Sequence, residues 1–334
     1  MTSVLDGATL TRSAQRSPRR IALIVVSKYG TLIAMAIMIV TFSLGSPRGS
    51  FLSANNLLAI VNQSALTAII ACGLTLVLVV GEMDLSIGYN ASLAGVLVTG
   101  LMASQGVPMI AAIVITLLIG AIVGLFNGFL VTKAGVNAVV ATLGVGTILI
   151  GMQFGYTAGS PIVLVPPEFK AITLGRIFEV QNSIWIMLLI LAVLWVVLNR
   201  TPMGQRMQAV GANKHAANLA GVRTDRAKIA AFVMAGTCAA ATGILLASLL
   251  GSGTVNAGDG YLLDSFAAVF LGAATLRDGE FHIIGTLLGV LVVNVGFNGL
   301  SLMGTPTFWQ FVFKGGILVL AIALSTVARK YSKV

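Results

Sequence analysis

Apolar segments of membrane-spanning length recur along the chain, and they constrain its fold more than any other feature. Such segments form helices in a bilayer, because every backbone polar group in the hydrocarbon core needs a partner within the protein. About twenty apolar residues cross the roughly 30 Å core, so the shorter segments are expected to be tilted, broken or re-entrant. The sequence therefore predicts an all-α polytopic membrane protein with about ten transmembrane helices, at about 21–44, 58–80, 85–103, 107–132, 136–156, 183–199, 229–250, 261–276, 283–300 and 309–328.

Charged residues are scarce and unevenly distributed. They make up 9% of the 334 residues, whereas soluble domains carry roughly 25%. The net charge of +10 does not indicate a nucleic-acid partner, because the Lys and Arg residues are scattered between the apolar spans. An excess of Lys and Arg marks cytoplasmic loops, and a cytoplasmic N-terminus would leave few of them outside: Arg48, Lys170 and Arg176. We therefore expect both termini in the cytoplasm, with a tail at 1–20, one transmembrane domain at 21–328 and a tail at 329–334.

Two acids interrupt the apolar pattern in the stretch GLTLVLVVGEMDLSIGYNASLAG, residues 73–95. Glu82 and Asp84 would be costly if they faced lipid. At the membrane boundary Asp84 can cap a helix that starts near Leu85, at the positive end of the helix dipole. We interpret Asp84 mainly as this cap. The alternative is an acid on a transport path or gate, a reading that extends to Glu82 and to Asp264 in a later span.

No constellation of residues indicates catalysis, a metal or a cofactor. Cys72 and Cys238 lie inside apolar spans without the spacing of a metal site or of a disulfide framework. His215 and His282 are isolated in expected inner loops. The chain has no G-x-x-x-x-G-K-[ST] phosphate loop. We expect a protein that is not an enzyme and that does not bind ATP through a phosphate loop of its own.

The expected inner loop at 200–228 contains signals for local structure. Thr201 followed by Pro202 is typical of a helix start. Asn213 can cap a short helix, KHAANLA, which Gly221 would end in a left-handed conformation. A single amphipathic helix at this place is either a docking element or an ordinary structured loop, and the residues alone leave both open. As a docking element it would present a narrow face of small side chains, Ala216, Ala217 and Ala220.

Amides and hydroxyls within the spans also need partners. Hydrogen bonds between helices, worth roughly 0.6–2 kcal/mol each, would explain most of them. Some could instead line a polar path for an uncharged, hydroxylated solute. The candidates for such a path are Asn62, Gln63, Thr67, Asn90, Asn127, Asn294 and Asn298.

Four stretches resemble, in order, the permease subunits of carbohydrate-type ABC importers, the ribose, xylose, galactose and autoinducer-2 group. They are GLTLVLVVGEMDLSIG (73–88), NGFLVTKAGVNAVVATLG (127–144), TPMGQRMQAVGANKHAANLAGV (201–222) and GYLLDSFAAVFLGAATL with GTLLGVLVVNVGFNGLSLMG (260–276, 285–304). The third is similar to the cytoplasmic coupling segment that docks into a groove on the ATPase subunit. The resemblance assigns coupling to Gly204, Gly211, Asn213, Ala216, Ala217, Asn218, Leu219, Ala220 and Gly221.

The resemblance implies a type II-like importer half with ten helices in the bacterial inner membrane. It also implies a second permease chain, the same or homologous, around a central path. A periplasmic binding protein would deliver the sugar, and separate ATP-binding cassette subunits would hydrolyse ATP. The family usually has Gly where Glu82 stands, prolines and Phe around 136–138, and a Gly-rich turn at 278–281. These departures leave the transport role intact and the sugar open.

Two other functions remain as alternatives. One is the related branched-chain amino-acid permease. The other is a stand-alone secondary transporter, which usually has paired broken helices and a coupling-ion site.

Overall fold

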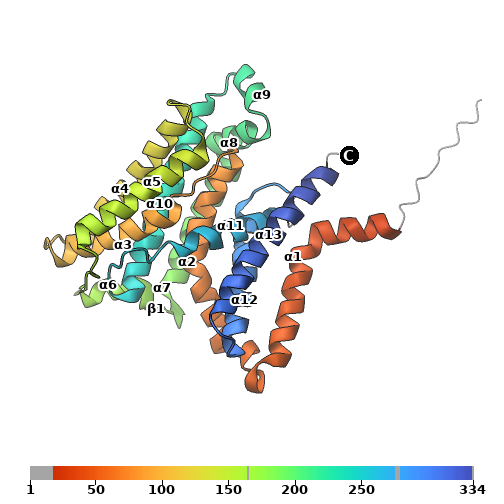
Figure 1. The fold of residues 1–334 in the computed structure, drawn as a ribbon, viewed down its shortest axis with the longest axis horizontal. Helices are drawn as coiled ribbons and strands as arrows, with labels where there is room; N and C mark the ends of the chain where they lie inside the picture. Colours follow the sequence, from red (N-terminus) through yellow and green to blue (C-terminus); the bar gives the residue numbers. More distant parts are fainter. Residues whose placement is uncertain (1–17, 164, 275–278, 333–334) are drawn as a thin grey trace, which may run out of the picture.

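The computed structural model describes residues 18–163, 165–274 and 279–332, which are helical almost throughout (Figure 1). The elements are α1 (Pro18–Gly45), the 3-10 helix η1 (Pro47–Leu52), α2 (Ala54–Val79), α3 (Ile87–Ala103), α4 (Met109–Thr132), α5 (Ala138–Thr157), α6 (Pro167–Leu174), β1 (Arg176–Ile177), β2 (Val180–Gln181), α7 (Asn182–Arg200), α8 (Pro202–Ala212), α9 (Lys214–Leu219), α10 (Thr224–Leu250), α11 (Gly260–Ala273), α12 (Ile283–Leu302) and α13 (Phe308–Ser332). The only sheet within the described residues is the antiparallel pair β1–β2.

The predicted all-α class is confirmed, and each expected span coincides with a helix. Six helices are long and apolar enough to cross a membrane within the described part of the chain: α2, α4, α5, α7, α10 and α12. Shorter apolar helices occupy the remaining expected spans, at Thr31–Gly45, Ile87–Ala103, Gly260–Ala273 and Phe308–Ala323. The expected tail at 1–20 lies outside the described residues except for 18–20, which belong to α1. Helix α13 continues to Ser332, beyond residue 328 where we expect the transmembrane domain to end.

Helix α10 is the centre of one group of helices, and α2 joins this group to a second one. α10 contacts α4, α3 and α2, while α2 also contacts α11 and α12. The second group is completed by α13, which packs on α11. Sixteen residues of α2 are buried, in agreement with its position between the two groups.

Glycines allow α10 and α4 to approach one another closely. A Cβ atom on Gly236 would collide with the Gly120 carbonyl, and one on Gly124 would collide with the Phe232 carbonyl. Within lipid there is little hydrophobic drive between helices, so close backbone approach supplies the packing energy. The small residues of the sequence therefore mark the contact between these helices.

The inner loop forms two short helices, and not the single helix that we expected. Thr201 Oγ1 accepts a hydrogen bond from the Gly204 N–H at 3.3 Å, and Pro202 is the first residue of α8. Asn213 Oδ1 accepts from the Ala216 N–H at 3.0 Å, which caps α9 as predicted. Gly221 has the predicted left-handed backbone, with φ of 81°. The two helices lie at one end of the bundle, and η1, α6 and β1 lie at the opposite end (Figure 1).

A substitution at Gly236 tests the role of this packing. Gly236→Ala should lower the thermal unfolding temperature of the detergent-purified protein, because the new methyl group forces α10 away from the backbone of α4. Overpacking of this kind typically costs about 1–3 kcal/mol. Gly151→Ala in α5 is the matched control, since no heavy atom lies within 4 Å of a Cβ there. Equal unfolding temperatures for the two variants would contradict the assignment.

Candidate functional site

The break between α2 and α3 is a tightly specified turn. Gly81 has φ of 79° and follows the last turn of α2. Its N–H donates to the Leu78 carbonyl at 3.1 Å, and the Glu82 N–H donates to the Val77 carbonyl at 3.0 Å. This pair of hydrogen bonds is the Schellman motif, which satisfies the last carbonyls of a helix. Helix α2 therefore ends with its carbonyls paired, directly before the two acids.

Asp84 is buried in this break, and its carboxylate accepts hydrogen bonds from Ser86, the residue before α3. Its Oδ1 accepts hydrogen bonds from the Ser86 N–H at 2.8 Å and from the Ser86 hydroxyl at 2.6 Å. The N-cap of α3 is Ser86, and the helix starts at Ile87. The prediction that Asp84 is the N-cap of a helix near Leu85 is therefore wrong. The carboxylate instead forms a turn two residues ahead of the helix.

Two neighbouring helices also hold the break. Asn127 Nδ2 of α4 donates to Ser86 Oγ at 2.7 Å. The Leu85 N–H donates to Thr142 Oγ1 of α5 at 3.0 Å. Burial raises the pKa of Asp84 to about 6, and the hydrogen bonds from Ser86 act in the opposite direction. The break is thus a polar network that joins α3, α4 and α5.

The break is also connected to the inner loop through α8 and α10. Lys228, in the first part of α10, forms an ion pair with Glu82, and the side chains are only 8% and 18% exposed. A Cβ on Gly211 of α8 would collide with the Val79 carbonyl at the end of α2. A more exposed pair joins Lys133 to Asp225 at 2.7 Å. Movement of α8 or of the start of α10 would therefore reach the α2–α3 break directly.

The predicted coupling residues in and around α8 and α9 divide into buried and exposed ones. Ala217 is 6% exposed and packs within the main hydrophobic core. The predicted docking face of three alanines is therefore wrong for Ala217, which points inward. Leu219, in contrast, is 78% exposed. Gly204 is also buried, and the other predicted coupling residues are exposed: Gly211, Asn213, Ala216, Asn218, Leu219, Ala220 and Gly221.

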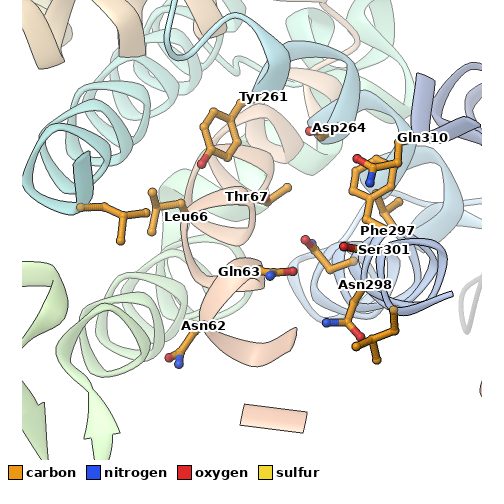
Figure 2. Close-up of a pocket in the computed structure, with 14 residues that line it drawn as sticks. Asn62, Gln63, Leu66, Thr67, Tyr261, Asp264, Phe297, Asn298, Ser301 and Gln310 are labelled. Atoms are coloured by element: carbon orange, nitrogen blue, oxygen red, sulfur yellow. The ribbon is translucent and has the colours of Figure 1, made fainter. Parts of the chain in front are cut away.

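A polar cavity lies between α2, α11, α12 and the start of α13 (Figure 2). Its volume is about 420 Å³, within the roughly 300–1,000 Å³ of small-molecule sites. Figure 2 shows Gln63 and Thr67 of α2 facing Asn298 and Ser301 of α12, with Asp264 of α11 between the two helices at one end. The lining residues are Asn62, Gln63, Leu66, Thr67, Leu249, Tyr261, Asp264, Val293, Asn294, Phe297, Asn298, Ser301, Leu302 and Gln310.

Five of the seven residues predicted to line a polar path line this cavity, namely Asn62, Gln63, Thr67, Asn294 and Asn298. The other two lie outside the cavity and bond between helices, as cavity-lining Asn298 also does with Asn56 of α2 at 2.9 Å. Asn90 Nδ2 donates to the carbonyls of Gly120 and Gly236, at 3.4 and 3.2 Å, and Asn127 holds Ser86. Asp264, which we predict as a gate residue together with the junction acids Glu82 and Asp84, lies inside α11 and lines the cavity.

Four polar or aromatic residues that line the cavity, and one ion-pair partner, were not predicted from the sequence. Tyr261, Phe297, Ser301 and Gln310 gave no signal, because single residues of these types are common in membrane helices. Lys314 did give a signal in the sequence. A charged residue inside an apolar span usually has a buried partner, and Lys314 forms an ion pair with Asp264 at 2.7 Å.

The described residues contain no group of three or more His, Cys, Asp or Glu that could hold a metal. Cys72 and Cys238 are buried free thiols.

An all-helical membrane chain with a polar cavity and a pair of capped helices at one end has the form of a transporter's membrane subunit. The chain belongs to the family described as branched-chain amino acid transport system / permease component, whose sequence model matches residues 56–322.

Named relatives are similar over nearly their whole length. Ribose import permease protein RbsC of Bacillus subtilis is 36% identical over 90% of this chain and 93% of that protein. Probable ABC transporter permease protein YphD of Escherichia coli is 36% identical over 89% of each chain. Xylose transport system permease protein XylH of Haemophilus influenzae is 28% identical over 90% of this chain and 96% of that protein. No solved structure matches the chain.

The buried carboxylate of Asp84 gives a testable dependence on pH. Because its pKa is raised above the ordinary 3.8 to about 6, the fold favours the protonated acid. Its contribution to stability is fully present below about pH 4 and is lost as the pH rises through about 6. Asp84→Asn keeps an oxygen acceptor for Ser86 and carries no charge. At pH 8 the Asn variant should therefore be more stable than the wild type, by on the order of 3 kcal/mol, and the difference should be absent at pH 4.

Thermal unfolding in detergent at the two pH values measures this difference. Asp84→Ala is the control, because it leaves the buried Ser86 N–H without an acceptor and should be less stable than Asp84→Asn at both pH values. A folded, assembled Asp84→Asn protein without transport would show instead that the charge itself is required.

Proposed function

We propose that the chain is the permease subunit of an ATP-driven importer that moves a sugar or a similar small hydroxylated solute from the periplasm to the cytoplasm. The observation that carries the proposal is the cavity rich in amides and hydroxyls, in a chain whose relatives are named ribose and xylose permeases. Amides and hydroxyls both donate and accept hydrogen bonds. They therefore match the hydroxyl groups of a neutral solute.

The proposed topology has ten transmembrane helices in the bacterial inner membrane, with both termini in the cytoplasm. The distribution of Lys and Arg supports it. With this orientation, α8 and α9 lie on the cytoplasmic face and the α12–α13 turn lies on the periplasmic face. The cavity residues Asn62 and Ser301 are close to the periplasmic ends of α2 and α12, so the cavity would receive solute from that side.

The proposed partners are ATP-binding cassette subunits, a periplasmic binding protein and a second permease chain. The absence of a phosphate loop from the sequence and the family of the chain support a separate ATPase. That subunit would dock on α8 and α9. Its movements would reach the α2–α3 break through the contact of Gly211 with Val79 and through the pair of Lys228 with Glu82.

Reconstituted transport tests the function. Proteoliposomes that contain this chain with its proposed ATPase and binding-protein partners should take up labelled D-ribose or D-xylose only when ATP is present on the cytoplasmic side. Vesicles that contain this chain alone should take up neither sugar under a proton or sodium gradient. Gradient-driven uptake by the chain alone would show a secondary transporter. ATP-driven uptake of L-leucine in place of sugars would show a branched-chain amino-acid permease.

Leu219 tests the docking of the ATPase. Leu219→Arg places a charge on the most exposed apolar position of α9 and leaves helix propensity nearly unchanged. The variant should insert normally but lose copurification of the ATPase, or lose most of the ATP hydrolysis stimulated by loaded binding protein. Leu219→Met is the control of similar size and should keep both. Wild-type hydrolysis and uptake by Leu219→Arg would mean that α9 does not couple the subunits.

A further inference from the structure

An ion pair forms part of the wall of the polar cavity. Lys314 Nζ of α13 lies 2.7 Å from Asp264 Oδ1 of α11, and the two side chains are 16% and 15% exposed. Lys314 Nζ also donates to the Gly260 carbonyl at 3.3 Å and lies 5.6 Å from the centre of the Phe297 ring. The lysine is therefore held in place by three neighbours, one of which is the carboxylate.

The two charges are not equivalent from inside the cavity. Asp264 lines the cavity, but Lys314 does not. A solute in the cavity would therefore contact the carboxylate of Asp264 and not the ammonium group of Lys314. A carboxylate that is ionised only accepts hydrogen bonds, and a hydroxyl donor to a charged acceptor makes a short, strong bond.

The remaining lining residues carry no compensating positive charge. None of the lining residues among the described part of the chain is Lys, Arg or His. The other polar groups are neutral, on Asn62, Gln63, Thr67, Tyr261, Asn294, Asn298, Ser301 and Gln310. An anionic solute would therefore lie near Asp264 without a cation to pair with, and like charges at a binding site are strongly unfavourable. A neutral solute with several hydroxyl groups has no such penalty.

We propose that Asp264, positioned by Lys314, makes this cavity a binding site for neutral polyhydroxylated solutes and excludes those that carry a carboxylate or phosphate group. The inference rests on the proposed function and adds to it the residue that sets the charge preference. It also separates sugars from amino acids. The ammonium group of an amino acid could approach Asp264, but its carboxylate would have no cationic partner in the cavity.

Weak binding to the permease itself can be measured without the binding protein. Saturation-transfer NMR on the permease–ATPase complex in nanodiscs should show transfer to D-ribose and D-xylose. Under the same conditions D-ribose 5-phosphate and L-leucine should bind at least about tenfold more weakly. Asp264→Asn should weaken binding of the two pentoses by about tenfold, the size expected for one lost charged hydrogen bond. Asp264→Asn should not weaken binding of D-ribose 5-phosphate. Glu179→Gln removes an acid that is 94% exposed in the β1–β2 hairpin, and it should leave all four values unchanged.

A charge exchange separates solute recognition from a purely structural ion pair. The double variant Asp264→Lys/Lys314→Asp keeps one positive and one negative charge in contact but places the cation on the cavity wall. It should reverse the order, so that D-ribose 5-phosphate binds more tightly than D-ribose. A structural role alone predicts that the order stays as in the wild type.

The outcomes distinguish this inference from the proposed function. If the reconstituted importer transports a pentose but Asp264→Asn and the exchange leave the binding order unchanged, the inference is wrong and the function stands. The inference is also wrong if the wild-type complex binds no pentose, or binds D-ribose and D-ribose 5-phosphate equally. ATP-driven transport of L-leucine without pentose transport would overturn both.

Discussion

Every polar group within a membrane helix must find its partner inside the protein, and this constraint organises the whole chain. Helices that cannot rely on water to drive them together must approach closely, as α10 and α4 do at Gly120, Gly124 and Gly236. The same contact brings the Gly120 and Gly236 carbonyls within reach of the Asn90 amide. At this contact, the close packing of two helices therefore also provides the hydrogen-bond acceptors for the Asn90 side chain.

The polar network at the α2–α3 break and the polar cavity lie in two different parts of the molecule. On the α3, α4, α5 and α10 side, side chains such as Asn127 and Thr142 bond within the protein and hold the α2–α3 break. On the α11, α12 and α13 side, Asn294 and Asn298 line the cavity, and Asn298 also exchanges hydrogen bonds with Asn56 of α2. Helix α2 belongs to both parts. Gln63, in its first half, lines the cavity, and its last residue, Val79, leads into the break that contains Glu82. A change at the break can thus reach the cavity along a single helix.

The charged pairs follow the same division. Lys228 and Glu82 join the start of α10 to the break, close to the two helices proposed to dock the ATPase. Lys314 and Asp264 join α13 to α11 at the wall of the cavity. Burying an ion pair costs solvation energy, and such a pair is weak evidence for stability on its own. One pair lies at the break and the other at the cavity wall, the two places where we propose coupling and selection of the solute.

The sequence was enough to predict the membrane class, the position of each apolar helix and the caps at Asn213 and Gly221, because these depend on runs of apolar residues and on local backbone geometry. It also identified most of the amides that line the cavity, since amides are rare in lipid-facing positions. The packing of helices distant in the chain was needed to show that Asn90 and Asn127 bond between helices, that Ala217 faces inward, that Ser86 and not Asp84 is the N-cap residue of α3, and that Lys314 pairs with Asp264. The physical reason is that small residues cover every face of these helices, so the sequence carries no amphipathic pattern that fixes their rotation. The rotation is set by contacts with helices distant in the chain, and it decides which side chains share a cavity.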